Sequence, residues 1–172
     1  SLLPKKVGAA ELKDYRPVSL IHGAIKIFEK VLATRLAAEL PHLVGNHQSA
    51  FVGGRSLHDN FMLVRQVARN LHKRKTKGVL VKMDISRAFD SLSWPFLFEV
   101  LRAKGFPEKW RSLIATLLSS ASSRVIVNGS VGDKILHACG LRQSDPISPL
   151  LFVIAMDALF ALIVRDQVTG VL

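Results

Sequence analysis

Cysteine is almost absent from this chain of 172 residues. The single Cys139 excludes a disulfide framework and a cysteine-rich zinc site. So low a cysteine content is typical of a reducing, intracellular compartment, without deciding between nucleus and cytoplasm. The chain also begins at Ser1 and has no charged and then apolar leader. We therefore expect a piece of a longer protein rather than a secreted precursor.

Long hydrophobic runs and acidic residues are scarce as well. The longest apolar run, PLLFVIAMDALFALIV at 149–164, is shorter than the roughly 20 residues of a bilayer span and contains Asp157. It predicts a core helix rather than a membrane helix. Only 13 Asp and Glu stand against 24 Lys and Arg, which gives a net charge of +11. An excess this large predicts an anionic partner, of which nucleic acid and acidic membrane surfaces are the usual candidates.

The hydrophobic content of 49% is enough for a real core, in one domain or two small lobes. Local patterns predict a strand pair within residues 1–20, a buried strand at 78–85 and an Asn-Gly hairpin within 122–138. Apolar periodicity and capping signals predict helices over 24–40, ended by Pro41, over 57–73, from Ser93 to Gly105, over 107–119, and from a cap at Ser148 onward.

An acid stands out in VKMDISRAFD, residues 81–90. On the predicted strand, Val81 and Met83 share one face, so Asp84 falls on the other face at the strand's exit. In a basic protein, a carboxylate there can hold Mg²⁺ against phosphate. It can equally cap the turn that follows, or serve another metal-dependent phosphoryl-transfer enzyme. Asp90, followed by Ser91, fits an ordinary helix cap. Spacing alone leaves these readings open.

Six blocks, in this order, resemble the successive fingers and palm motifs of a reverse transcriptase: LLPKK, DYRPVSLI, QSAFVGGRSLHDN, KMDISRAFDSLSW, VNG and GLRQSDPISPLLF. They are most similar to the non-LTR (LINE-type) retrotransposon enzymes, with group II intron enzymes as more distant kin. The resemblance covers essentially the whole chain. It implies an α/β (α+β) polymerase right hand, with fingers over 1–77 and a truncated ferredoxin-like palm over 78–172.

The implied function is RNA-directed DNA synthesis from a primer by two-metal nucleotidyl transfer. The implied partners are an RNA template, a DNA primer or RNA–DNA hybrid, deoxynucleoside triphosphates and two Mg²⁺ ions, with no membrane. In such enzymes the acid at Asp84 is catalytic and binds the metals. The resemblance assigns nucleotide binding to Lys5, Lys6, Arg16, Ile85, Ser86, Arg87, Ala88, Phe89 and Gln143.

These assignments have distinct chemical reasons. The amides of the turn at 85–88 would face the triphosphate, which Arg16 and Lys5 or Lys6 would also hold. Phe89 would crowd the 2′ position of the sugar, although without the resemblance a core aromatic is as good a reading. Gln143 would lie against nucleotide and template. Arg142 and the basic run at 73–77 would be generic phosphate contacts.

The chain also departs from the family pattern. Ser144 stands where the family usually has Gly, and Cys139 where it usually has Arg. The family's aromatic-Ala-Asp-Asp hairpin is not in the sequence, and Asp145, Asp157 and Asp166 do not replace it. We therefore expect an incomplete metal site and no activity from this chain alone, with the remaining palm and the thumb missing. The alternative is a non-catalytic, nucleic-acid-binding remnant of a decayed element.

Overall fold

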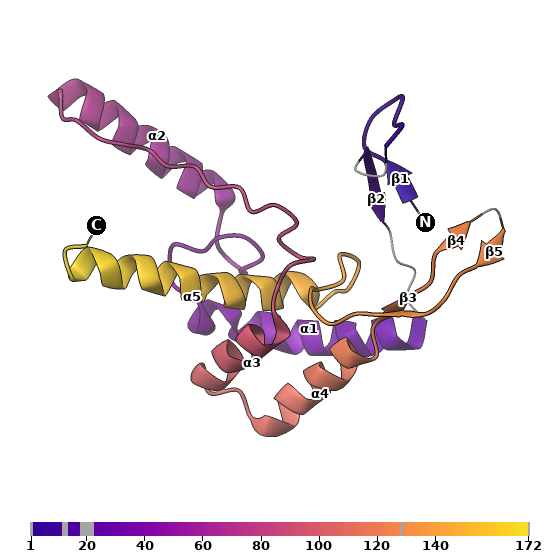
Figure 1. The fold of residues 1–172 in the computed structure, drawn as a ribbon. Helices are drawn as coiled ribbons and strands as arrows, with labels where there is room; N and C mark the ends of the chain where they lie inside the picture. The colour runs from indigo at the N-terminus through magenta and orange to yellow at the C-terminus, as the bar shows by residue number, and fades with distance from the viewer. Residues whose placement is uncertain (1, 12–13, 18–22, 128, 172) are drawn as a thin grey trace.

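The computed structural model describes residues 2–11, 14–17, 23–127 and 129–171. These ranges form a mixed α/β arrangement of helices and two-stranded antiparallel ladders (Figure 1). The helices are α1 (Gly23–Leu43), α2 (Leu57–Arg74), α3 (Trp94–Ala103), α4 (Glu108–Ser119) and α5 (Ser148–Val168). The ladders pair β1 (Leu2–Pro4) with β2 (Tyr15–Pro17), β3 (Ser122–Ser123) with β6 (Ile135–Leu136), and β4 (Ile126–Val127) with β5 (Ser130–Val131). The ferredoxin-like sheet is not among the described elements.

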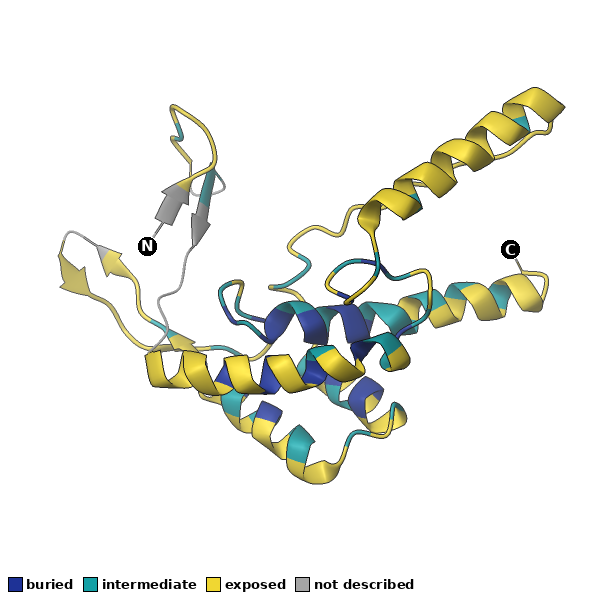
Figure 2. Ribbon diagram, turned by 180° about the vertical axis from the view of Figure 1, so that it is seen from behind, coloured by how far each residue is buried: buried dark blue, intermediate teal, exposed yellow. Residues whose placement is uncertain are grey.

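The core lies where α1, α3, α4 and the first half of α5 meet. Figure 2 shows the buried residues concentrated there, while α2 and the second half of α5 are mostly exposed. Leu40, Leu97, Leu101 and Ile154 are fully buried at this junction. Each such side chain contributes about 1.5–3 kcal/mol relative to an exposed one, so this junction is what holds the helices together.

The buried face of α1 differs from the predicted one. Ile27 and Val31 belong to the apolar spacing that predicts this helix, yet both are exposed. The buried stripe consists of Glu29, Leu32, Ala33, Leu36 and Leu40. These positions recur every three or four residues, as one side of a helix requires. The stripe therefore brings a carboxyl group, Glu29, into the core.

The end of α1 was also predicted too early, because the helix contains Pro41 and continues to Leu43. Near the end of a helix, proline removes one N–H from the ladder without stopping the chain. Backbone carbonyl groups at the C-terminal end of α1 accept hydrogen bonds from a side chain. The Arg55 guanidinium donates to the carbonyl oxygens of Pro41, Val44, Gly45 and Gln48. A side chain from the next loop thus completes the end of α1.

Several local predictions are confirmed. The β1–β2 pair lies within residues 1–20, and α2 and α4 have the expected ranges. Ser93 caps α3, with its Oγ accepting the Phe96 N–H at 3.5 Å. Val127 pairs with Ser130, so a two-residue connection closes the hairpin; Asn128 lies outside the described residues. The predicted N-cap of α5, Ser148, is wrong by one residue. Ile147 is the cap residue, and Ser148 is already helical and buried.

Helix α5 is long and apolar enough, by length and composition, to cross a membrane. Its 21 residues exceed the run on which the sequence prediction rested. The first half, from Ser148 to Ala155, supplies much of the core, as predicted for a core helix. Asp157 lies two residues beyond Ala155, where it accepts hydrogen bonds from the Lys104 Nζ at 2.7 Å and the Gly45 N–H at 2.9 Å. The acid in the apolar run therefore joins three segments.

The predicted buried strand at 78–85 is wrong. This segment forms neither strand nor helix, and Val79, Leu80, Val81 and Met83 are each at least 67% exposed. In Figure 1 it runs back along α2, with Gly78 beside Leu71. A strand is stable only when its backbone groups pair with a neighbour and its side chains are covered. Within the described ranges, no segment pairs with 78–85.

Candidate functional site

The backbone turns sharply just after Asp84. The turn covers 86–91, so Ile85 precedes it rather than belonging to it as expected. The Arg87 carbonyl accepts the N–H groups of Asp90 at 2.9 Å and Ser91 at 3.0 Å. Arg87 has a φ of 50°, a left-handed conformation that costs a residue with a Cβ about 1–2 kcal/mol. The surrounding contacts must stabilise this turn.

These contacts come from the loop before α5. The Leu141 N–H donates to the Phe89 carbonyl, and the Gly140 N–H to the Leu92 carbonyl, both at 2.7 Å. The Trp94 indole N–H donates to the Gly140 carbonyl at 2.7 Å. Gly140 has a φ of 82°, and a Cβ there would lie 2.6 Å from the Asp90 carbonyl oxygen. Glycine is therefore required for the loop to approach the turn this closely.

Side chains of the turn and the loop also meet. The Gln143 amide donates to the Asp90 carboxylate at 3.4 Å, and the Cys139 thiol approaches the Asp90 carbonyl at 3.6 Å. The Phe89 ring stacks on Phe152 of α5, with centroids 4.7 Å apart. Asp90 is thus a partner of Gln143 rather than the helix cap that the sequence predicted. Phe89, Asp90 and Gln143 form one surface directly after Asp84.

Asp84 itself is exposed at the entry to this turn. Within the described ranges, no group of three or more His, Cys, Asp or Glu side chains is placed to hold a metal ion. Mg²⁺ usually takes one or two protein carboxylates and completes its shell with water and phosphate. Asp84 can therefore supply one ligand, but the residues present do not form a complete metal site.

The predicted triphosphate ligands near the N-terminus lie elsewhere. Lys5, Lys6 and Arg16 belong to the β1–β2 hairpin, which stands apart from the helical body in Figure 1. The Lys6 ammonium is 2.9 Å from the Asp14 carboxylate and lowers the pKa of that group. The Arg16 side chain is outside the described part of the chain. The structure therefore does not bring these residues to the turn after Asp84.

Residues 3–169 match the family of reverse transcriptases, the RNA-dependent DNA polymerases. The chain belongs to the reverse transcriptase family. It is 31% identical over 99% of its length to an uncharacterized 149 kDa protein of transposon TX1 from Xenopus laevis. It is 31% and 32% identical, over 91% of its length, to retrovirus-related Pol polyproteins from the R2 elements of Drosophila melanogaster and Nasonia vitripennis.

These relatives come from non-LTR retrotransposons, so the LINE-type resemblance is confirmed. The reverse transcriptase chain spans 13% of the TX1 protein and 15% of each of the two R2 polyproteins. The match is thus to one region of much longer proteins.

One departure from the reverse transcriptase pattern is accommodated by the backbone. Ser144 replaces the usual glycine, but it is not among the described residues with positive φ. The serine therefore causes no backbone strain of the kind that requires glycine. Its side chain is half-buried in the loop that carries Gln143.

The basic residues that were predicted to contact phosphate differ in their exposure. Lys73, Arg74, Lys75 and Lys77, at the end of α2 and after it, are exposed, as phosphate contacts must be. Arg142 is half-buried and lies 4.0 Å from the Asp145 carboxylate, so it has an internal ion-pair partner. Its role as a generic phosphate contact stays a prediction. Asp145 and the buried Glu29 were both missed as site residues. The position of Glu29 on the helical stripe of Leu32 and Leu36 was the available signal.

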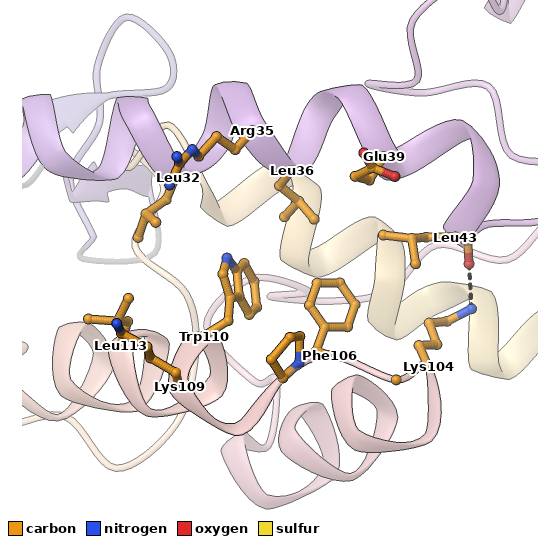
Figure 3. Close-up of a pocket in the computed structure, with 12 residues that line it drawn as sticks. Leu32, Arg35, Leu36, Glu39, Leu43, Lys104, Phe106, Lys109, Trp110 and Leu113 are labelled. Atoms are coloured by element: carbon orange, nitrogen blue, oxygen red, sulfur yellow. Dashed lines mark hydrogen bonds between the residues drawn. The ribbon is translucent and has the colours of Figure 1, made fainter.

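A hollow of about 670 Å³ lies between α1 and the segment joining α3 to α4 (Figure 3). Its walls are mainly apolar, with Leu36, Phe106 and Trp110 facing the space. Lys104 closes one end by donating to the Leu43 carbonyl at 2.6 Å. None of the predicted nucleotide or metal residues lines it, so it is separate from the candidate site.

Proposed function

We propose that this chain selects and orients the incoming nucleotide in an RNA-directed DNA polymerase. Fingers over residues 1–77 and a partial palm over 78–172 would extend a DNA primer on an RNA template with deoxynucleoside triphosphates. One observation carries this proposal: the turn after Asp84 docks on the 139–145 loop, where Asp90 pairs with Gln143. Phe89, which precedes Asp90 in the chain, is thereby held beside this pair. Two elements whose contacting residues, Asp90 and Gln143, are 53 positions apart thereby make one surface.

The roles within this surface follow from its contacts. Phe152 supports one face of the Phe89 ring, which fixes the ring against a sugar and would exclude a 2′-hydroxyl by steric contact. Asp90 orients the Gln143 amide, which has both donors and acceptors for a base or template strand. The exposed basic run at 73–77 would attract the nucleic-acid backbone without reading its sequence. We propose no membrane partner.

Asp84 is the proposed catalytic and metal-binding residue. When bound, two Mg²⁺ ions supply activation of the primer hydroxyl and stabilisation of the leaving pyrophosphate. The further carboxylates that this chemistry needs are not placed within the described residues. The step that these residues perform is therefore the binding and orientation of the nucleotide.

Primer extension by the intact protein that contains residues 1–172 tests the proposal. Asp84→Asn should lower extension by about 100-fold or more, because an amide cannot replace the charge of a metal ligand. Asp133→Asn, at an exposed acid beyond β5, is the matched control and should leave extension unchanged. The 172-residue chain alone should show no extension. A folded Asp84→Asn protein that polymerises normally would remove Asp84 from the site.

A further inference from the structure

A pair of buried carboxyl groups joins α1 to the loop before α5. Glu29 of α1 is 1% exposed, and Asp145 of the loop before α5 is 6% exposed. They are 116 positions apart in the chain, yet the two side chains are within hydrogen-bonding reach of each other. Glu29 Oε2 and Asp145 Oδ1 are both buried and have no hydrogen-bond partner among the described residues. Such a site is costly unless the pair shares a proton.

The surrounding charges decide which carboxyl group holds that proton. Burial and, second to it, the neighbouring Asp145 together raise the pKa of Glu29 from 4.5 to about 7, against the opposing effects of Arg142 and Lys26. Burial also raises the pKa of Asp145, with Arg142 opposing. Arg142 lies 4.0 Å from Asp145 and forms its ion pair. Asp145 is therefore the ionised member, and Glu29 is the neutral one that donates.

We propose that Glu29 is a positioning residue for Gln143, holding the 141–148 loop on α1 through a proton that it shares with Asp145. This inference rests on the proposed role of Gln143 in nucleotide binding. Asp145 is two residues from Gln143, and its carbonyl accepts the Ser148 N–H at 3.3 Å where α5 begins. A contact at Asp145 thus fixes both the loop and the start of the core helix.

Loss of the shared proton would release the loop. With Glu29 ionised, two carboxylates would face each other in the core, and Arg142 and Lys26 are the cations near them. Like charges in a buried site repel strongly because water does not screen them. The loop would then move from α1, and the 3.4 Å contact between Gln143 and Asp90 would be lost. The apparent KM for the nucleotide should therefore rise with pH, while the metal ligand Asp84 is untouched.

The first experiment measures KM and kcat for a deoxynucleoside triphosphate between about pH 6 and pH 9, with the intact protein and a primed RNA template. In the wild type, KM should rise as pH passes the Glu29 value near 7. Glu29→Gln keeps a permanent N–H donor toward Asp145, so its KM should stay low and lose this dependence. Glu29→Ala should give a KM that stays about 3- to 10-fold above the low-pH wild-type value and does not change with pH, as expected for the loss of one hydrogen bond. Glu39→Gln, at an exposed acid of the same helix, should behave like the wild type.

The second experiment needs no activity, so it separates this inference from the proposed function. The infrared difference spectrum between wild type and Glu29→Gln should show a protonated carboxyl that titrates near pH 7. Absence of that band would overturn the shared proton. A normal band together with an unchanged KM profile in Glu29→Gln would overturn the positioning role. A protein with the band but without any polymerase activity would instead contradict the proposed function.

Discussion

Asp157 offers the sharpest test of how this fold is held together. Its side chain is 12% exposed, and it accepts hydrogen bonds from the Lys104 ammonium at 2.7 Å and the Gly45 N–H at 2.9 Å. Burial acts to raise the pKa of Asp157, but Lys104 and the Gly45 amide outweigh it and leave the value below the usual 3.8. The group therefore adds stability above about pH 3.8, and this is lost as pH falls through the lower folded pKa.

We expect Asp157→Leu to lower the free energy of unfolding by about 2–3 kcal/mol near pH 7. Breaking a fully buried ion pair costs about 3–5 kcal/mol. The cost here is smaller because Lys104 is 21% exposed and keeps its bond to the Leu43 carbonyl. Adding Lys104→Met should restore about 1 kcal/mol of this loss, since the lone charge is gone, although the Gly45 N–H and the Leu43 carbonyl then both lack their partners.

The measurement is urea unfolding of the dilute chain, followed by circular dichroism. Asp166→Asn is the matched control on the same helix, because the Asp166 side chain pairs with its neighbour Arg165 at the surface. That change should cost less than about 0.5 kcal/mol. The reasoning is refuted if Asp157→Leu costs no more than the control, or if the double variant is as unstable as the single one.

Three further predictions concern the intact protein. Phe89→Ala should permit ribonucleotide incorporation while most deoxyribonucleotide incorporation remains. The thermal unfolding of the variant must be measured in parallel, because losing the ring can cost up to about 3 kcal/mol of stability. Continued rejection of ribonucleotides would assign Phe89 to the core. The basic run consists of Lys73, Arg74, Lys75 and Lys77. Replacing these residues with Gln should flatten the slope of log affinity for an RNA–DNA hybrid against log salt concentration by about 0.9 for each lost phosphate contact. An unchanged slope would contradict their role as phosphate contacts. Ser144→Gly should raise primer extension, because the backbone tolerates serine but its side chain would obstruct the approach of the nucleotide; no change would show that the serine is harmless.

Much of the helical structure could be predicted because its causes are local. The cap at Ser93 and the apolar periodicity of α4 depend on residues within a turn or two. The motif order also identified the family before any fold was known. The strand at 78–85 failed for the opposite reason. Its apolar residues are typical of a buried strand, but a strand needs a partner from elsewhere in the chain.

The proposed nucleotide surface shows the same division. The sequence by itself determined which residue types the proposed site uses: the acid at Asp84, the aromatic at Phe89 and the amide at Gln143. Only the tertiary structure decided their partners, because Asp90 meets Gln143 across 53 positions and Gly45 meets Asp157 across 112. Pairings this distant arise from how the helices pack, and helix packing depends on side chains throughout the core. No local pattern contains that information. The helical stripe of Leu32 and Leu36 could have placed Glu29 in the core, but only the tertiary structure brought it to Asp145.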